Sequence, residues 1–393
     1  MRKDQPADGV FQMFTSREYI MTPGPTPIPE RIIKAIISKE ALLPAYDKIY
    51  GEDLKLVMKL TDSDGKAVIM GGGATVGLES ALSSLIGDYD KVLVLSAGFF
   101  GDILSNMAKL YSKKVNILRA KVGNTVNDED VKKFLKENSD TKFVILTHCE
   151  TSTGALFNLE SLSKTIRSYS NALIIVDCVS TIGAIPVSIR KGHADVLIFG
   201  IQKVLNMPPG LAIIVLGKNA LGILERREGR SYYMNLKTWI SYWEERGYLP
   251  STPPVNLLYG LREAINMLFE EGLENVFKRH KKVSNTLRNY LEKLGLELVV
   301  KDHSIASPTV TAFYVPAKIS DKEFTERLWN DFRVLIARTY GELRGKAVRI
   351  GHMGSSATLD NIYVTLIAIA STLRKMGIKV PKHMFQNLLL NVS

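Results

Sequence analysis

Short apolar runs of strand length alternate with helix-like segments through the first half of the chain. The apolar runs lie at residues 66–70, 91–95, 115–118, 143–147, 172–176, 195–199 and 211–216. Most are continuously apolar, which is typical of strands that are covered on both faces. Amphipathic helical patterns fall between several of them, at residues 75–85, 103–111, 128–137 and 159–169. This alternation predicts a mostly parallel sheet flanked by helices.

The loop between the last two of these runs is too short to hold a crossover helix, so one of the two strands is expected to run antiparallel. The pattern changes after Gly217. Two long helical patterns follow at residues 257–270 and 273–294, then strand-like runs at 296–300, 309–315 and 334–338, and a closing helix at 358–374.

The predicted fold class is α/β. It has a large domain with a mostly parallel seven-stranded sheet and a smaller C-terminal α+β domain. The predicted boundaries are residues 1–20 for an N-terminal segment, 21–255 for the large domain and 256–393 for the small one. We place the N-terminal segment beside the small domain as a hypothesis.

Composition indicates an ordinary globular protein, with 46% hydrophobic and 23% charged residues. No apolar run reaches the roughly 18 residues that a membrane-spanning helix needs. The first six residues do not open a signal peptide. Cys149 and Cys178 are the only cysteines and can build neither a disulfide scaffold nor a four-cysteine zinc site. We therefore expect a cytoplasmic protein with no membrane partner and no metal site.

The charge balance is basic, with 51 Lys and Arg against 40 Asp and Glu, or +11. Such a charge suits nucleic acid or small anionic substrates. The densest basic cluster, residues 278–282, lies in a helical pattern with apolar residues at core spacing. This is typical of a solvated helix face, so we expect no nucleic-acid partner.

A glycine-rich turn, Gly71-Gly72-Gly73-Ala74-Thr75, follows a predicted strand and opens a predicted helix. Consecutive glycines let the backbone direct N–H groups toward an anion at a helix N-terminus, and a phosphate is the natural ligand. The turn lacks the Gly-Lys-Ser/Thr of a P-loop and the third glycine of the dinucleotide motif. Leu95 ends the next strand and is followed by Ser96 rather than an acid, which disfavours a dehydrogenase. A tight turn without a ligand fits this segment equally well.

Two further polar residues follow buried strands. Asp177 ends an apolar run, where ligands bind in open α/β sheets, although a lone Asp there also caps the following turn. Lys203 follows the next strand in a loop restrained by Pro208 and Pro209, a position that suits an amine with a lowered pKa able to form a Schiff base. Pyridoxal phosphate requires a pyridinium partner, a Schiff-base lysine and a phosphate cradle. The glycine-rich turn, Asp177 and Lys203 together match these requirements.

The chain resembles the class V, fold-type-I aminotransferases that use pyridoxal 5'-phosphate (PLP), and within them the serine–pyruvate/alanine–glyoxylate aminotransferase group. Motifs spread over nearly the whole chain carry the resemblance: Thr22-Pro23-Gly24-Pro25-Thr26, Glu150-Thr151-Ser152-Thr153-Gly154, Val176-Asp177-Cys178-Val179-Ser180, Gln202-Lys203-Val204-Leu205-Asn206-Met207-Pro208-Pro209-Gly210 and Val348-Arg349-Ile350-Gly351. The lysine motif with its Pro-Pro-Gly end is the most specific.

The resemblance implies that Lys203 holds the cofactor and acts as the general base, and that Asp177 pairs with the pyridine nitrogen. It implies phosphate contacts from Gly73, Ala74, Thr75 and Gln202. Phe100 would stack on the ring, and Thr151 would lie near its phenolic oxygen. Arg349 would bind the substrate carboxylate in a pocket that Gly24 and Pro25 also line.

The resemblance further implies a homodimer with shared active sites, because Thr252 matches a threonine that reaches the phosphate of the neighbouring subunit. Some features allow other interpretations. Phe100 is also compatible with a core role, and Thr252 with shaping the Pro-Pro turn. Ser251 stands where many relatives have a tyrosine, and Tyr248 is the candidate to replace it. Residues 43–46 replace a segment that often carries a histidine.

The implied activity is transfer of an amino group from serine or alanine to glyoxylate or pyruvate. Alternatives within the fold are a ureidoglycine–glyoxylate aminotransferase and a PLP lyase or cysteine desulfurase. A desulfurase needs a mobile thiol, whereas Cys149 and Cys178 both flank apolar strands. A basic nucleic-acid-binding protein is the non-enzymatic alternative, and it would leave Lys203, Asp177 and Arg349 without a common purpose.

Overall fold

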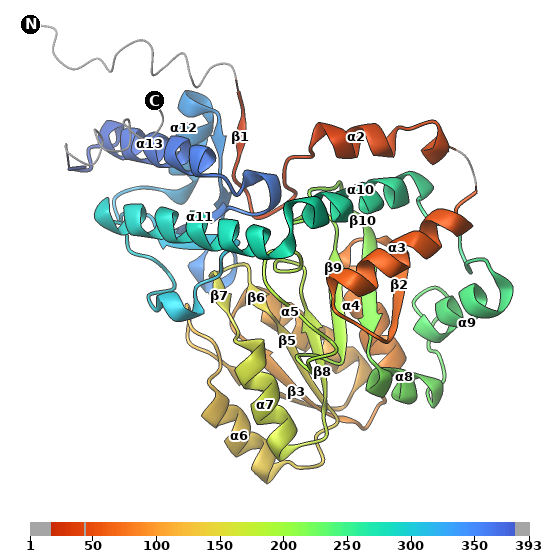
Figure 1. Ribbon diagram of the computed structural model, residues 1–393. Coiled ribbons are helices and arrows are strands. Elements are labelled where there is room, and N and C mark those ends of the chain that lie inside the picture. Colours follow the sequence, from red (N-terminus) through yellow and green to blue (C-terminus); the bar gives the residue numbers. More distant parts are fainter. Residues whose placement is uncertain (1–16, 43–44, 382–393) are drawn as a thin grey trace, which may run out of the picture.

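A computed structural model describes residues 17–42 and 45–381, which pack around two main hydrophobic cores (Figure 1). Residues 1–16, most of the predicted N-terminal segment, lie outside the described residues, as do Leu43 and Pro44 of the segment that departs from the family pattern. The C-terminal elements, drawn in blue, lie together to one side of the large sheet with β1 (Tyr19–Ile20) beside them. No described helix is long and apolar enough to span a membrane.

The first core is built on a seven-stranded sheet in the order β2-β10-β9-β8-β5-β3-β4, which confirms the predicted α/β class. Its strands are β2 (Lys66–Gly72), β3 (Lys91–Ser96), β4 (Lys114–Arg119), β5 (Phe143–Thr147), β8 (Leu173–Asp177), β9 (Val196–Gly200) and β10 (Gly210–Leu216). β10 runs antiparallel to both of its neighbours, as the short preceding loop predicts. The other neighbouring strands pair in parallel. β5, β8 and β9 are buried along their whole length, as continuously apolar strands should be.

Helices surround this sheet. They are α2 (Glu30–Ile36), α3 (Asp47–Leu60), α4 (Ala74–Leu85), α5 (Phe99–Tyr111), α6 (Asp128–Glu137), α7 (Leu159–Tyr169), α8 (Lys218–Glu225), α9 (Leu236–Arg246) and α10 (Val255–Glu271). Gly77 brings α4 close to the sheet, since a Cβ there would lie 3.0 Å from Ile198 and 3.1 Å from Ala212. The N-terminus of α4 is thereby held at the edge where the parallel strands end.

The second core comprises α11 (Leu273–Lys293), β11 (Val310–Tyr314), α12 (Asp321–Phe332), β12 (Val334–Leu335), β13 (Ala337–Arg338), β14 (Ala347–Gly351) and α13 (Leu359–Lys375). β11, β14 and β13 form an antiparallel sheet in that order. β1 pairs in parallel with β12, and Tyr19 and Met21 are buried in the second core. The chain therefore begins its described part in the second core before it enters the first.

Two sequence predictions differ from the structure in this region. The prediction of a strand at residues 296–300 is wrong. This segment meets the edge of β11 only briefly, and Leu298 makes an isolated bridge to Phe313. The predicted strand at 334–338 is split at Ile336, because β12 pairs with β1 while β13 pairs with β14. The division into residues 1–20, 21–255 and 256–393 remains a proposal. α10 begins at that second boundary, and its buried side chains belong to the first core.

Candidate active site

A cavity of about 520 Å³ lies where the parallel strands of the large sheet end. Most of the predicted site residues line it: Gly24, Pro25, Ala74, Thr75, Phe100, Thr151, Asp177, Gln202, Lys203 and Arg349. Gly73 and Thr252 are the two predicted residues that do not. The cavity thus joins the first core, the second core and the segment after β1, three regions far apart in the sequence.

Lys203 lies in the loop after β9, and its amine reaches two hydroxyl groups. Nζ donates to Oγ of Ser180 at 2.7 Å and to Oγ1 of Thr151 at 3.3 Å. The amine also lies 5.7 Å from the centre of the Phe100 ring. Burial lowers the pKa of Lys203 from its usual value, and the nearby Asp177 carboxylate opposes this shift. The result is an amine suited to nucleophilic attack and proton transfer.

Asp177 is the last residue of β8 and is only 7% exposed. Its Oδ1 accepts a hydrogen bond from the backbone N–H of Val179 at 2.9 Å, and its Oδ2 accepts a longer one, 3.4 Å, from Thr147. Burial raises the pKa of Asp177, and the hydrogen bond from Val179 and the charge of Lys203 oppose this shift. Within the described ranges no side chain forms an ion pair with the carboxylate. A buried carboxylate in this state favours a cationic ligand group in the cavity.

The N-terminus of α4 opens beside the cavity as a candidate anion site. Gly73 is its N-cap and supplies no side-chain acceptor for the first N–H groups of the helix. A Cβ on Gly73 would meet no protein atom within 4 Å. The side chain of Gln202 lies nearby, and its buried Oε1 has no hydrogen-bond partner in the part of the chain that is described. Free helix N–H groups beside an unpartnered amide fit a phosphate.

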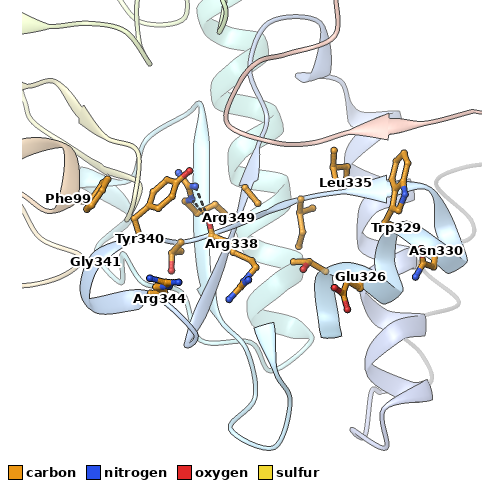
Figure 2. Close-up of a pocket in the computed structure, with 14 residues that line it drawn as sticks. Phe99, Glu326, Trp329, Asn330, Leu335, Arg338, Tyr340, Gly341, Arg344 and Arg349 are labelled. Carbon is orange, nitrogen blue, oxygen red and sulfur yellow. Dashed lines mark hydrogen bonds between the residues drawn. The ribbon is translucent and has the colours of Figure 1, made fainter. Parts of the chain in front are cut away.

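Arg349 extends from β14 into the opposite side of the cavity and is 4% exposed. Its Nη1 donates to the carbonyl oxygen of Thr151 at 3.1 Å, while Nε and Nη2 donate to that of Arg338 at 3.1 and 2.8 Å. Figure 2 shows the ring of Tyr340 against this guanidinium, with the Arg349 Cζ atom 4.6 Å from the ring centre. Burial lowers the pKa of Arg349. No carboxylate of the described residues forms an ion pair with its guanidinium. A buried guanidinium of this kind is suited to bind a substrate carboxylate.

The segment after β1 closes over the lysine loop. Gly24 has φ of 100°, and a Cβ there would lie 2.9 Å from Cγ of Lys203, so the position requires glycine. Thr26 donates from Oγ1 to the carbonyl oxygen of Lys203 at 2.6 Å. Asn206 lies in the same loop as Lys203 and ties it to two other segments: its Nδ2 lies 2.9 Å from Oγ1 of Thr26 and 2.9 Å from Oγ of Ser355.

Sequence reasoning missed two residues that complete the cavity. Ser180 is the nearest hydrogen-bond partner of the Lys203 amine. Its position in the turn directly after Asp177 is the sequence feature that could have identified it as a site residue. Tyr340 has no local signal in the sequence, because its contact with Arg349 depends on the fold of the second core. Thr252 lies exposed in the loop before α10, outside the cavity of its own chain.

The residues present fit PLP. The cavity offers an amine with a lowered pKa, a buried carboxylate that forms no ion pair among the described residues, an aromatic ring and an open helix N-terminus. These are the groups that a pyridine ring with an aldehyde and a phosphate would use. Its volume is also within the range of small-molecule sites.

Comparison with known proteins agrees with this geometry. Residues 46–335 match the sequence profile of the aminotransferase class-V family. An uncharacterized aminotransferase of Methanocaldococcus jannaschii is 32% identical over 93% of this chain and 94% of its own length. A serine–glyoxylate aminotransferase of Methylorubrum extorquens is 33% identical over 86% of this chain and 87% of its own. The crystal structure of the ureidoglycine–glyoxylate aminotransferase of Bacillus subtilis has a TM-score of 0.87 and 30% identity, over 96% of this chain and 98% of that one. The protein is therefore a member of the class-V aminotransferases, PLP-dependent enzymes of fold type I.

Proposed function

We propose that this aminotransferase moves an amino group from a small amino acid, serine or alanine, to glyoxylate or pyruvate. One observation carries the proposal: the buried Arg349 guanidinium has no carboxylate partner among the described residues and lines the same cavity as the Lys203 amine. An arginine so placed would grip the α-carboxylate that amino acids and 2-oxo acids share. The relative from Methylorubrum acts on serine and glyoxylate, which supports the same choice here. The likeness to the Bacillus enzyme keeps ureidoglycine as an alternative donor.

Each residue of the cavity would have a separate task. PLP, when bound, supplies an electron-withdrawing ring that stabilises negative charge at the substrate Cα. Nζ of Lys203 would take the proton from Cα of the amino acid and, in the second half-reaction, deliver a proton to Cα of the 2-oxo acid, with Ser180 and Thr151 orienting the amine. Asp177 would hold the positive charge at the pyridine nitrogen. Arg349 would fix the carboxylate, so that Cα lies within reach of the amine.

The remaining predicted residues would hold the cofactor in place. The phosphate would bind to the backbone of Gly73, Ala74 and Thr75 at the start of α4 and to the Gln202 amide. The Phe100 ring would cover one face of the pyridine ring, and Gly24 and Pro25 would line the substrate side of the cavity.

We further propose a homodimer in which each chain lends Thr252 to the phosphate site of the other. The position of Thr252 supports this, since the residue is exposed and does not line the cavity of its own chain. We propose that this dimer works in the cytoplasm, where the two buried cysteines of each chain would remain free thiols.

The cysteines also argue against the desulfurase alternative. Cys149 is 1% exposed and Cys178 is fully buried. Burial raises the pKa of Cys149 to about 11 and raises the pKa of Cys178 as well. Neither thiol is therefore available as the accessible thiolate that sulfur transfer requires.

The test is an activity panel with the PLP-loaded protein, in which serine, alanine and ureidoglycine are each paired with glyoxylate and with pyruvate. Among these three donors, we expect serine or alanine with glyoxylate to give the highest kcat/KM. Lys203→Ala should abolish turnover without unfolding the protein, because it removes an amine from a loop rather than volume from a core. Lys318→Ala, which removes an exposed lysine that does not line the cavity, serves as the control. Near-normal turnover by Lys203→Ala without added amines would overturn the proposal.

A further inference from the structure

A second and larger cavity, of about 730 Å³, lies beside the active-site cavity (Figure 2). The two cavities share Leu335, Ala337, Tyr340 and Arg349 as lining residues. The second one extends between α12 and the segment that follows it, residues 335–344. The side chains of alanine and serine, a methyl and a hydroxymethyl group, are too small to fill this second cavity. The proposed small donors therefore do not explain why the cavity is present.

The charged groups that line the second cavity are mainly guanidinium groups. Arg338, Arg344 and Arg349 line this cavity, and among the described residues Glu326 is the one acidic residue that lines it with them. Glu326 lies 3.7 Å from Lys322. The excess of positive charge favours an anionic ligand over a neutral one.

Two of the three arginines are already engaged. Arg349 is held by backbone carbonyls and is the candidate partner of the α-carboxylate. Nε of Arg338 donates to the nearly buried Asp321 carboxylate at 2.8 Å, which neutralises its charge.

Arg344 differs from both of them. Within the described ranges its guanidinium forms no ion pair and no side-chain hydrogen bond, and Figure 2 shows it on the same side of Tyr340 as Arg338. Arg344 is exposed, and it is thus the lining arginine whose charge no acidic side chain in the described part of the chain pairs with.

We propose that the second cavity binds an anionic group at the far end of a substrate side chain, with Arg344 as the main charge partner. The inference rests on the proposed function, because Arg349 would hold the α-carboxylate and thereby direct the side chain past Tyr340 toward Arg344. Both half-reactions use one cavity in turn. An amino acid with a carboxylate or phosphate on its side chain would therefore be a further amino donor beside serine and alanine, with a small 2-oxo acid such as glyoxylate as the acceptor.

The experiment compares kcat/KM for aspartate, glutamate and phosphoserine with that for alanine, using glyoxylate as acceptor. The parent enzyme should prefer at least one of the three acidic donors over alanine. Arg344→Ala should lower kcat/KM for that donor roughly ten- to hundredfold, the effect of losing one charged hydrogen bond. The loss for alanine should be at least tenfold smaller. Lys346→Ala is the matched control, because it removes a positive charge two positions away that does not line the cavity.

A binding measurement separates this inference from the proposed function. Calorimetric titration of the PLP-loaded protein with succinate and with butyrate should show tighter binding of the dicarboxylate, and Arg344→Ala should remove the difference. If serine or alanine reacts but no acidic donor exceeds alanine and succinate binds no better than butyrate, the inference is wrong and the proposed function stands. If no amino acid reacts, the proposed function fails, and the titration alone decides whether the second cavity binds anions. Equal losses for acidic donors and alanine in Arg344→Ala would also overturn the inference.

Discussion

The carboxylate of Glu150 accepts a hydrogen bond at 3.1 Å from the backbone N–H of Phe100, fifty positions earlier in the chain. The same carboxylate accepts bonds from the backbone N–H groups of Gly101 and Ser152, each at 3.0 Å, and from the Ser152 hydroxyl. Glu150 is fully buried, and the N-cap of α5 is Gly98, which has no side chain. Glu150 therefore caps α5 from a distant part of the sequence and fixes the backbone that carries the Phe100 ring.

Replacing this carboxylate should disturb the cofactor site through Phe100. We expect Glu150→Gln to weaken PLP binding by about tenfold and to lower the free energy of unfolding by about 1–3 kcal/mol, because buried N–H donors lose an acceptor. Fluorescence titration with PLP and urea unfolding measure the two effects. Glu160→Gln, at an exposed residue paired with Lys164, should change neither. An unaltered PLP affinity in Glu150→Gln would contradict the positioning role.

Asp177→Asn should lower kcat by about a hundredfold or more, with a much smaller effect on folding. The amide cannot hold a positive charge at the pyridine nitrogen, and charge stabilisation of this kind is typically worth several kcal/mol. Folding is spared because the amide oxygen can still accept the hydrogen bond from the backbone of Val179. Single-turnover kinetics and thermal unfolding measure the two quantities. If the variant keeps most of its kcat, Asp177 only caps the turn.

Arg349→Lys should raise KM for amino acids and 2-oxo acids by about tenfold or more, while PLP affinity changes little. Lysine keeps the charge but loses the planar fork that binds a carboxylate with two hydrogen bonds. It also cannot reproduce the bonds to the carbonyls of Thr151 and Arg338. Steady-state kinetics with serine and with ethanolamine, which lacks the carboxylate, provide the comparison. Equal reactivity of ethanolamine and serine in the parent enzyme would rule out this role.

Mixed dimers test whether Thr252 serves the partner subunit. Lys203→Ala and Thr252→Glu homodimers should both be inactive, the second because a carboxylate would repel the phosphate. Dissociated and reassembled together, the two variants should form mixed dimers with one doubly damaged site and one intact site. Activity should therefore reappear, up to about half of the parent activity per mixed dimer. Verified mixed dimers that stay inactive would place Thr252 in the site of its own chain.

Stability should fall steeply below pH 6, because several histidines are buried in the neutral form. Burial lowers the pKa of His148 and of His352 to about 3, and that of His280 to about 4. In the unfolded chain each titrates near 6.5, so the unfolded state binds more protons below that pH. The stability that each contributes is complete above about pH 6.5 and is lost as the pH falls toward 4 or 3. His280→Gln should reduce the slope of the unfolding free energy against pH by about 1 kcal/mol per pH unit between pH 6 and 5. An unchanged slope in urea unfolding would contradict this assignment.

The large sheet and the polar residues at its strand ends were predictable because their signals are local. A continuously apolar strand followed by Asp177, or by a loop with Lys203, is visible in about ten consecutive residues. Parallel strands place their carboxyl ends at one edge, so both residues were expected at the same edge of the sheet. The structure lines one cavity with both.

Contacts between distant segments were not predictable in the same way. The bond from Glu150 to Phe100 and the contact of Tyr340 with Arg349 depend on loops that no periodicity describes. The expected strand at residues 296–300 has the right apolar residues, but the partner edge is available to it over too short a distance. Apolar composition predicts burial in such cases and does not predict pairing.

Asn206 joins three parts of the molecule that a hinge would have to separate. Its side chain is bonded to Thr26 in the segment after β1 and to both the backbone N–H and the hydroxyl of Ser355 in the second core, while its backbone belongs to the lysine loop. A rotation of the second core against the large sheet must either break these bonds or carry the lysine loop with it. As long as these bonds hold, the lysine loop, the segment after β1 and Ser355 can move only as one body, so a shift of the second core would carry the loop of Lys203 with it.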